Sequence, residues 1–507
     1  MNEIMRHQEE GVRALSAKAE FALFDEPGIG KSRQVLEAAN TLFQNGSITL
    51  VLIVCPAQCV FQWFDKDLGE IARWNSLPVK VLHPGSGESW ITEKYAGHPA
   101  VYIICSYEWL RSGTHAEEVA QMLKGQKTYL VLDESSFVRN RKTKQFKATL
   151  APRYGRVKKR GEKKWSTIGP GAVRCTILNG TPVANDLSDL WAQFYILNKQ
   201  ILGCTFWQWR EKHCVMGGWM KKEVISYRDL DGKVYPKKEG IPPLLLDSLS
   251  PYILCRRKRD VLDLPPLTHS VITVPMDEET WKHYRKMREE FLVWLDSKEF
   301  TAANAAVKVM RLAQICNGFL TNPGYDALGK SVTNPTYLDD QPKLNWIVAY
   351  LQERANTTRT PIIVWCWWRA QIFALEERLR DQSFEVFTLH GTTKDADREE
   401  ALKRFHPGHT IKHKRSVLIA QHAAGGMGLN LSAADESLHA SSSHSFILRE
   451  QADGRIDRPG QKNPMMITDV IATGPKGQRT IEDGMLRARR SKEDLSTWTK
   501  DRWRKSI

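Results

Sequence analysis

The sequence predicts an α/β protein built on a doubly wound parallel sheet. Short apolar runs at residues 21–24, 49–56, 101–106 and 129–133 are separated by segments of helical character. Uninterrupted apolar strands of this kind are typical of parallel sheets, because both faces of the strand are buried. A glycine-containing turn after the first run leads directly into a helical segment. Strands that alternate with helices in this way favour a sheet whose ligands bind beyond the carboxyl ends of the strands.

The first apolar run continues into the pattern D-E-P-G-I-G-K-S at residues 25–32. Glycines let backbone N–H groups approach a phosphate, and the start of a helix favours an anion. Lys31 is spaced to reach the β- and γ-phosphate oxygens, and the Ser32 hydroxyl to coordinate Mg²⁺. Asp25 stands where the general phosphate-loop pattern has its first glycine, so the pattern alone also fits a Gly-Lys-Ser turn without function. The residues predicted here to bind ATP are Pro27, Gly28, Ile29, Gly30, Lys31, Ser32 and Arg33.

An amphipathic helix is predicted over residues 9–19, just before the first strand. Gln8, at its start, can read the edge of an adenine through its paired donor and acceptor. Taken in isolation, the same residue would be a surface glutamine. We include Arg6 and Gln8 among the predicted nucleotide-binding residues.

The strand at residues 129–133 ends in two adjacent acids, Asp133 and Glu134. Such a pair suits a nucleotide hydrolase, because one carboxylate can hold Mg²⁺ while the other orients or deprotonates the attacking water. We predict the first role for Asp133 and the second for Glu134. An acidic turn without catalytic role is the alternative, which the phosphate loop in the same sheet pattern disfavours. A further strand at 172–178 and a helix at 187–197 are expected to follow.

Positive charge is concentrated in residues 141–164, where many lysines and arginines accompany a single acid, Glu162. The stretch predicts a mobile basic loop that either contacts a phosphate backbone or is simply solvated. The whole chain carries 73 Lys and Arg against 58 Asp and Glu, a net charge of +15. This surplus favours a polyanionic partner, since neutralising phosphates releases counterions. A basic surface without such a partner is the alternative.

The nine cysteines are scattered and show no metal-ligand spacing, so they predict reduced thiols in a cytosolic compartment. No secretory signal is visible at the first residues, and no run approaches the roughly 18 apolar residues that cross a membrane. Secretion and membrane insertion are therefore not expected.

The second half ends in the motif Q-A-D-G-R-I-D-R-P-G-Q at residues 451–461. Arg455 and Arg458 lie three apart, which predicts that both project from one face of a short helix. A planar guanidinium suits a γ-phosphate, and an arginine supplied across a cleft is worth roughly a thousandfold in rate. A helix face salt-bridged by Asp453 and Asp457 is the alternative.

Together these motifs resemble the Swi/Snf-type ATPases of helicase superfamily two, which are double-stranded DNA translocases. Residues 25–32 resemble the family's D-E-x-G-x-G-K-T, which accounts for Asp25, and 178–185 are similar to its T-G-T-P-x-x-N segment. The signature R-R-K-R-D-V-L-D-L-P-P at 256–266 closely resembles the one that leaves the family's first lobe. The resemblance implies two RecA-like doubly wound lobes with a helical insertion between them, at residues 1–198, 199–337 and 338–507.

The resemblance also implies that ATP and Mg²⁺ bind between the lobes. Lys31, Ser32, Asp133 and Glu134 would then serve from one side, and Gln451, Arg455 and Arg458 from the other. Duplex DNA would be bound by backbone contacts, for which the matching positions are Pro56, Gln58, Gln62, Ser106, Gly180, Thr181, His390, Gly391, Gly425, Gly426, Gly428 and Asn430.

Three departures from the family pattern are visible. Ser136 stands where the family usually has histidine, and residues 443–445 replace a common Trp-Asn pair. Ser32 replaces the commoner threonine and keeps the hydroxyl for Mg²⁺. None of these removes a group that hydrolysis requires.

The predicted function is therefore an ATP-dependent double-stranded DNA translocase, either monomeric or working with a protein partner that supplies specificity. A bacterial or viral cytoplasm is the expected setting. An RNA or single-strand helicase stays an alternative. A nucleotide-gated DNA-binding module with slow turnover, suggested by Ser136, is another.

Overall fold

The computed structural model divides into two compact units, Met1–Asp263 and Leu264–Ile507. Each unit contains its own parallel sheet and is described by itself. The structure describes residues 3–67, 69–84, 99–157, 165–180, 182–183, 187–217, 223–296, 302–325, 331–358, 360–406, 415–425, 429–442 and 446–490.

The first unit is organised around a parallel sheet whose strand order is β12-β1-β8-β5-β2-β4-β3. Strands β2, β4 and β5 are buried along their whole length, as their unbroken apolar sequences predict. The strands are β1 (Glu20–Leu23), β2 (Leu50–Cys55), β3 (Val79–Leu82), β4 (Ala100–Ser106), β5 (Thr128–Leu132), β8 (Arg174–Leu178) and β12 (Ile253–Leu254).

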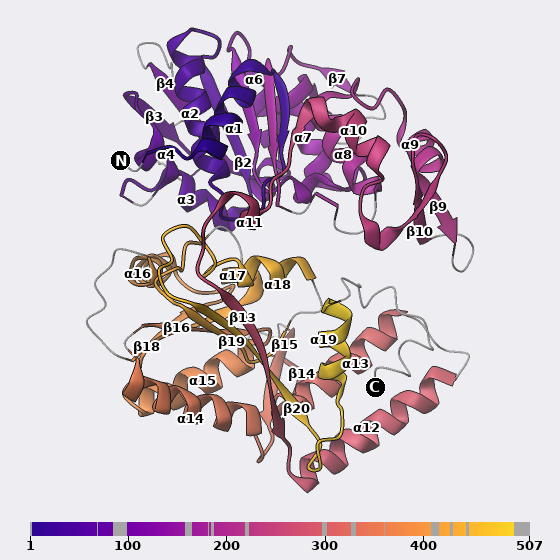
Figure 1. Ribbon diagram of the computed structural model, residues 1–507, viewed down its shortest axis with the longest axis vertical. Coiled ribbons are helices and arrows are strands. Elements are labelled where there is room, and N and C mark those ends of the chain that lie inside the picture. Colours follow the sequence, from indigo (N-terminus) through magenta and orange to yellow (C-terminus); the bar gives the residue numbers. More distant parts are fainter. Residues whose placement is uncertain are drawn as a thin grey trace. The chain divides into compact units, whose positions relative to one another are not determined.

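Helices cover both faces of this sheet. Figure 1 shows α1 and α2 on one side and α7 and α8 on the other. The helices of the unit are α1 (Arg6–Ala17), α2 (Lys31–Gln44), α3 (Val60–Phe64), α4 (Glu70–Trp74), α5 (Tyr107–Leu110), α6 (His115–Met122), α7 (Lys144–Tyr154), α8 (Ser188–Asn198), α9 (Phe206–His213), α10 (Pro243–Leu249) and α11 (Lys258–Val261). The predicted doubly wound α/β fold is confirmed.

The prediction of a mobile basic loop over residues 141–164 is wrong for its first part. Residues 144–154 form helix α7, whose Phe146 and Leu150 are buried in the core at i, i+4 spacing. Arg153 is also buried, and its guanidinium donates to the carbonyls of Ile196 and Leu197. The guanidinium of Arg153 is therefore bonded within the protein and does not serve as an exposed phosphate contact. Residues 158–164 lie outside the described residues.

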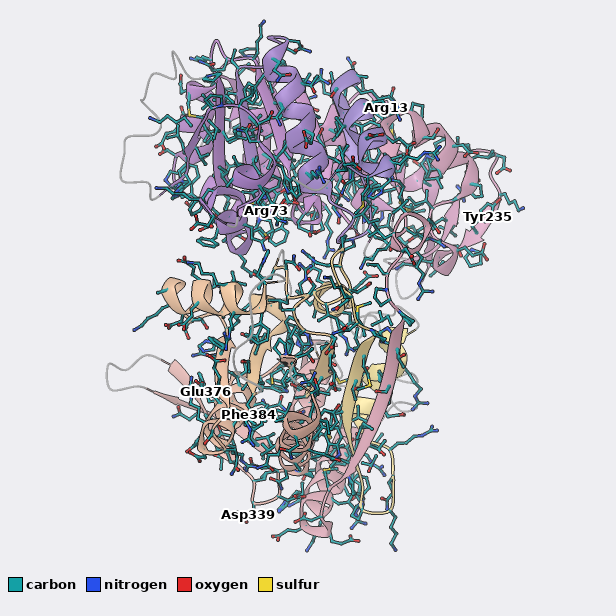
Figure 2. All side chains as sticks on the ribbon, turned by 60° about the vertical axis from the view of Figure 1, so that its left-hand side comes forward. Arg13, Arg73, Tyr235, Asp339, Glu376 and Phe384 are labelled. Atoms are coloured by element: carbon teal, nitrogen blue, oxygen red, sulfur yellow. The ribbon has the colours of Figure 1, made fainter. Side chains whose placement is uncertain are left out.

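A small antiparallel sheet of order β11-β10-β9 follows α9 within the first unit. Its strands are β9 (Cys214–Gly217), β10 (Glu223–Arg228) and β11 (Val234–Pro236). Tyr235 of β11, labelled in Figure 2, lies beneath the ammonium of Lys233. Helix α10 then leads to β12, which returns the chain to the main sheet.

The second unit contains a parallel sheet of order β13-β20-β19-β16-β18-β17. In Figure 1, α14 and α15 lie on one side of it and α13 and α19 on the other, each pair with its own apolar core. Its strands are β13 (Leu267–Pro275), β16 (Ile362–Cys366), β17 (Glu385–Leu389), β18 (Ser416–Gln421), β19 (Glu436–His439) and β20 (Met465–Thr473).

The second unit has helices α12 (Glu278–Asp296), α13 (Ala302–Cys316), α14 (Pro342–Thr357), α15 (Arg369–Asp381), α16 (Asp395–Phe405), α17 (His422–Gly425), α18 (Phe446–Asp453) and α19 (Ile481–Arg490), with a hairpin of β14 (Phe319–Tyr325) and β15 (Ser331–Tyr337). The predicted boundaries at 198 and 337 stay predictions. Within the described ranges, no helix is both long and apolar enough to cross a bilayer.

Candidate functional site

The phosphate loop joins β1 to α2 at the carboxyl edge of the first sheet. Gly28 and Gly30 have φ angles of 92° and 89°, a left-handed backbone that side chains disfavour. Gly30 is also the residue before the first turn of α2, whose leading N–H groups have no partner within a helix. The loop thus presents backbone donors and a helix start, the combination that binds phosphate.

Lys31 begins α2 and folds its side chain back over the loop. Its ammonium donates to the carbonyl oxygens of Asp25 at 2.7 Å and Glu26 at 3.3 Å. These two bonds hold the ammonium beside the phosphate loop, at the sequence position that a triphosphate requires of the lysine.

Asp25, the residue that departs from the general pattern, fixes the start of the loop through its contact with Arg256. Its carboxylate is fully buried and accepts two hydrogen bonds from Arg256, at 2.9 Å from Nε and 2.5 Å from Nη2. Arg256 also donates to the side-chain oxygen of Gln34 at 2.8 Å. A bidentate arginine of this kind fixes both position and direction. Sequence reasoning missed the contact, although it had placed Arg256 in a family signature.

Helix α1 contacts the loop through two buried side chains. His7 Nε2 lies 3.0 Å from the carbonyl oxygen of Ile29, and Gln8 Nε2 donates to the same oxygen at 3.2 Å. A Cβ atom on Gly30 would stand 2.3 Å from Gln8 Nε2, so a side chain there would displace the end of Gln8, and the φ of 89° disfavours it further. Gln8 therefore contacts the backbone of the phosphate loop directly, through the Ile29 carbonyl. Its contact with adenine stays a prediction.

The two predicted arginines of this region lie differently. Arg6 is exposed. Arg33 is buried, with its guanidinium 4.1 Å from the ring centroid of Trp74 and its Nη1 donating to the Glu3 carbonyl at 3.2 Å.

The acid pair follows β5 directly. Glu134 has φ 49° and ψ 57°, a left-handed conformation that is strained for a residue with a side chain. Its N–H donates to Asp133 Oδ1 at 3.0 Å, and the indole N–H of Trp63 donates to Asp133 Oδ2 at 3.1 Å. This sharp reversal keeps both acids at the carboxyl edge of the sheet.

The surroundings of Asp133 raise the pKa of its carboxyl from 3.8 to about 6. Loss of water around the carboxyl is the largest cause, followed by the charge of Glu134, while the Trp63 hydrogen bond and the charge of Lys31 oppose them. The effect of its charge places Lys31 of the phosphate loop within electrostatic reach of Asp133. A hydroxyl from Ser32 and a carboxylate from Asp133 are hard oxygen ligands that fit Mg²⁺. Among the described residues, no cluster of three or more His, Cys, Asp or Glu is suited to a metal on its own.

The segment after β8 lies between these two elements, because β8 pairs with β1 on one side and β5 on the other. A Cβ on Gly180 would meet Pro27 Cδ at 2.7 Å, so this segment packs tightly on the phosphate loop. Thr181 and residues 184–186, both parts of the predicted segment, lie outside the described residues.

The remaining predicted nucleic-acid positions of the first unit lie at the ends of β2 and β4. Pro56 is buried, whereas Gln58 and Gln62 are partly exposed. Ser106 caps α5 by accepting the N–H of Trp109 at 3.0 Å.

In the second unit, the prediction that both motif arginines project from a helix is wrong. Helix α18 ends at Asp453, and Arg455 and Arg458 lie in the turns that follow. Pro459 disfavours a helical backbone at Arg458, the residue before it. Arg455 is buried, and its guanidinium donates to the carbonyls of Gln451 at 2.7 Å and Leu429 at 3.0 Å. Arg458 is partly exposed. The two arginines therefore have different surroundings.

Other predicted positions of this unit lie after β17 and β18. His390 is largely buried, and its Nδ1 lies 3.1 Å from the Thr392 hydroxyl. Gly425 packs against Trp365, where a Cβ would approach the ring to 3.0 Å. Asn430 accepts a hydrogen bond from the Ser432 hydroxyl at 2.9 Å. Gly391 is exposed, Gln451 is buried, and Gly426 and Gly428 lie outside the described residues.

Comparison with known proteins gives matches over nearly the whole chain. Residues 7–160 and 162–319 match the SNF2-related domain, and residues 342–460 match the helicase conserved C-terminal domain. An uncharacterized ATP-dependent helicase of Mycoplasma genitalium is 24% identical over 98% of this chain. A RAD54-like DNA repair and recombination protein of Danio rerio is 23% identical over 99% of it.

The chain spans 42% of the length of the Mycoplasma relative and 68% of that of the Danio relative. Among solved structures, the Sulfolobus solfataricus SWI2/SNF2 ATPase core in complex with double-stranded DNA matches with a TM-score of 0.40 and 19% identity, covering 100% of this chain and 97% of that one.

Proposed function

This chain belongs to the SNF2-related family, and from that premise we propose that it is an ATPase that moves along double-stranded DNA. Membership implies an ATP-dependent, helicase-like enzyme. The dependence on DNA, the preference for duplex and the movement are our proposal. So are the monomeric state, a protein partner that adds specificity, and a cytoplasmic setting.

The observation that carries the proposal is the meeting of the phosphate loop and the acid pair at one sheet edge. Lys31 would bind the β- and γ-phosphate oxygens, while Ser32 and Asp133 would hold Mg²⁺. Glu134 would orient the attacking water and accept its proton. ATP supplies the phosphoanhydride bond, and bound Mg²⁺ neutralises charge on its phosphates. Arg458 would stabilise the charge that develops during transfer.

Support for a nucleic-acid partner comes from charge and from the segments at the same edge. The net charge of +15 favours a polyanion. Contacts to a phosphate backbone carry little sequence information, which suits a motor that must bind at every step. Ser106 ends β4, and Pro56 and Gly180 follow β2 and β8 of the sheet that carries the proposed catalytic groups.

The first experiment measures ATP hydrolysis by the full chain with duplex DNA, single-stranded DNA and RNA. We expect duplex DNA to stimulate turnover most. Lys31→Ala should abolish turnover by weakening nucleotide binding, and Glu134→Gln should abolish it while nucleotide still binds. Turnover that survives Glu134→Gln would contradict the hydrolytic assignment. Strongest stimulation by RNA or a single strand would instead favour the helicase alternative.

A second experiment tests movement. Displacement of a third strand from a DNA triplex, measured beside the unwinding of a forked duplex, separates translocation from strand separation. We expect ATP-dependent displacement without sustained unwinding. Nucleotide-dependent duplex binding with neither activity would favour the slowly cycling binding module.

A further inference from the structure

Three segments of the first unit meet the acid pair through hydrogen bonds that the proposed chemistry does not itself use. The segments follow β2, β4 and β8, and each carries predicted nucleic-acid contacts. Three side chains form these bonds to residues 133–135: Trp63, Tyr107 and Gln193. Gln193 lies on α8 and is linked to the segment after β8 by its bonds to Asn179 and Pro182. None of the three was predicted as a site residue.

Trp63 connects the segment after β2 to the carboxylate. It lies on α3, one residue beyond the predicted contact Gln62, and its side chain is buried. Its indole N–H donates to Asp133 Oδ2 at 3.1 Å. A hydrogen bond to a charged acceptor is stronger and more directional than a neutral one. Any displacement of α3 therefore acts directly on the orientation of Asp133.

Tyr107 connects the segment after β4 to the backbone of the same acid. It follows the predicted contact Ser106, is fully buried, and its hydroxyl donates to the Asp133 carbonyl at 2.9 Å. Its ring stacks on Phe137 with centroids 5.5 Å apart, which helps to fix the direction in which the hydroxyl points. The carbonyl of Asp133 precedes the strained peptide of Glu134, so this bond helps to set the turn.

Gln193 connects the segment after β8. It lies on α8, is fully buried, and uses all four hydrogen-bonding positions of its amide. Its oxygen accepts from the Ser135 hydroxyl at 2.7 Å and from Asn179 Nδ2 at 3.1 Å. Its nitrogen donates to the carbonyls of Pro182 at 2.8 Å and Asp189 at 3.0 Å. One amide thus joins the turn of the acids to both ends of the segment that packs on the phosphate loop.

We propose that Trp63, Tyr107 and Gln193 are positioning residues that transmit the engagement of duplex DNA to the acid pair. The inference rests on the proposed function. Each side chain spans from a predicted DNA-facing segment to the turn at residues 133–135, and each bond is directional. When DNA orders the three segments, the three bonds hold Asp133 and Glu134 in the productive arrangement. Without DNA, the turn samples other arrangements and hydrolysis is slow.

The test compares turnover with and without saturating duplex DNA, expressed as a stimulation factor for the full chain. Tyr107→Phe removes one hydrogen bond and keeps the ring. Trp63→Phe removes the indole N–H together with part of the ring, and Gln193→Met removes all four bonds of the amide at similar volume. We expect each to lower the stimulation factor by at least about tenfold, the effect of one lost hydrogen bond at the turn. The combined Trp63→Phe and Gln193→Met variant should be scarcely worse than either alone, because the bonds act on one turn.

Matched controls remove equivalent bonds elsewhere in the unit. Trp191→Phe removes an indole N–H that donates to the Cys204 carbonyl, and Tyr129→Phe removes a buried hydroxyl bonded to Thr176. Both should retain the stimulation factor of the unaltered chain. Affinities for Mg·ADP and for duplex DNA, with the melting temperature, are measured for every variant. We call the three positioning residues the relay. If the relay transmits DNA engagement, each relay variant should still bind Mg·ADP and duplex DNA, but duplex DNA should stimulate its turnover much less.

Three outcomes would overturn the inference. If duplex DNA stimulates the unaltered chain and all three variants equally, the relay is wrong and the proposed function stands. If the variants lose stimulation only in proportion to lost nucleotide affinity or lost folding, their role is structural. A chain that shows no stimulation by duplex DNA would contradict the proposed function itself and the relay with it.

Discussion

At the scale of single residues, the two arginines of the 451–461 motif have separate expected roles. Arg455 is 2% exposed and holds the carbonyls of Gln451 and Leu429, whereas Arg458 is partly exposed. Arg455→Ala should lower the free energy of unfolding by about 2–3 kcal/mol, because it leaves two buried carbonyls unpaired. Arg458→Ala should leave stability unchanged and lower turnover by roughly a thousandfold.

Urea unfolding and steady-state hydrolysis check this prediction, with Arg458→Lys as a control. Lysine keeps the charge but cannot make the planar, two-point contact of a guanidinium, so it should restore little of the rate. A stable Arg455→Ala variant with the larger catalytic defect would reverse the assignment.

His390 gives a prediction about pH. Burial lowers the pKa of this histidine from 6.5, helped by the neighbouring charges of Arg369 and Arg398 and opposed by Glu376. It is therefore neutral at pH 7.5 and gains a proton only as the pH falls below its lowered pKa. The protonated form adds one cation at a predicted DNA contact, so the salt slope of duplex binding should steepen by about 0.9 at low pH.

Fluorescence titration of labelled duplex measures this slope over a range of salt concentrations, at pH 7.5 and at a series of lower pH values. His390→Gln should keep the same slope throughout the series. Equal steepening in that variant would place the titrating group elsewhere. Because the folded state resists this proton, the free energy of unfolding should also fall below pH 6.5 in the unaltered chain.

At the scale of elements, Asp229 caps helix α10 from the turn after β10. Its carboxylate accepts the N–H groups of Leu230 at 2.9 Å, Leu244 at 3.0 Å and Leu245 at 2.8 Å. Burial raises the pKa of Asp229, but these three hydrogen bonds outweigh it, and the pKa lies below 3.8. Asp229→Ala should cost about 1–2 kcal/mol of stability at neutral pH.

The sign of the pH dependence follows from the lowered pKa. The stabilisation is present above about pH 3.9, the pKa in the unfolded chain, and is lost as the pH falls through the lower pKa of the folded state. Urea unfolding at pH 7 and pH 3 compares the unaltered chain with Asp229→Ala. The difference between their free energies of unfolding should be smaller at pH 3. A constant difference would mean that the carboxylate acts through packing. Asp229→Asn, which keeps one acceptor oxygen, should lie between the two.

Sequence reasoning succeeded where a chemical pattern lies within one short stretch. The phosphate loop, the acid pair and the apolar strands are all read from neighbouring residues, and the structure places them at one sheet edge. Contacts between distant residues gave no such signal. Asp25 and its partner Arg256 are 231 positions apart, and Trp63 and Asp133 are 70 apart. The sequence around one member of such a pair does not indicate the other member, because only the order of the strands in the sheet brings the two residues together.

Helix α7 and the arginine turn show how a local pattern can mislead. The many lysines and arginines of residues 141–164 led to the prediction of a loop. Phe146 and Leu150 nevertheless have the spacing of a buried helix face. The three-residue spacing of Arg455 and Arg458 suggested a helix, but α18 ends at Asp453, and Pro459 disfavours a helical backbone at Arg458. In both regions, charge was read as exposure. Arg153 and Arg455 are instead buried cations whose donors are satisfied by backbone carbonyls.

At the scale of the whole molecule, two sheets with separate cores predict two unfolding events. The first unit contains the phosphate loop and the acid pair, and the second contains Arg455. Scanning calorimetry of the full chain should therefore show two transitions, of which Mg·ADP raises only that of the first unit. At a hundred times the dissociation constant, the ligand adds about 2.7 kcal/mol, or roughly 5–11 °C for a unit of this size.

Two variants assign the transitions. Lys31→Ala should remove the nucleotide shift, because it removes a phosphate contact in the first unit. Arg455→Ala should lower the other transition and leave the nucleotide shift intact, because its unpaired carbonyls lie in the second unit. If nucleotide raised the transition that Arg455→Ala lowers, or if a single transition moved with both, then the units would unfold together. Nucleotide binding would in that case be felt throughout the chain even in the absence of DNA.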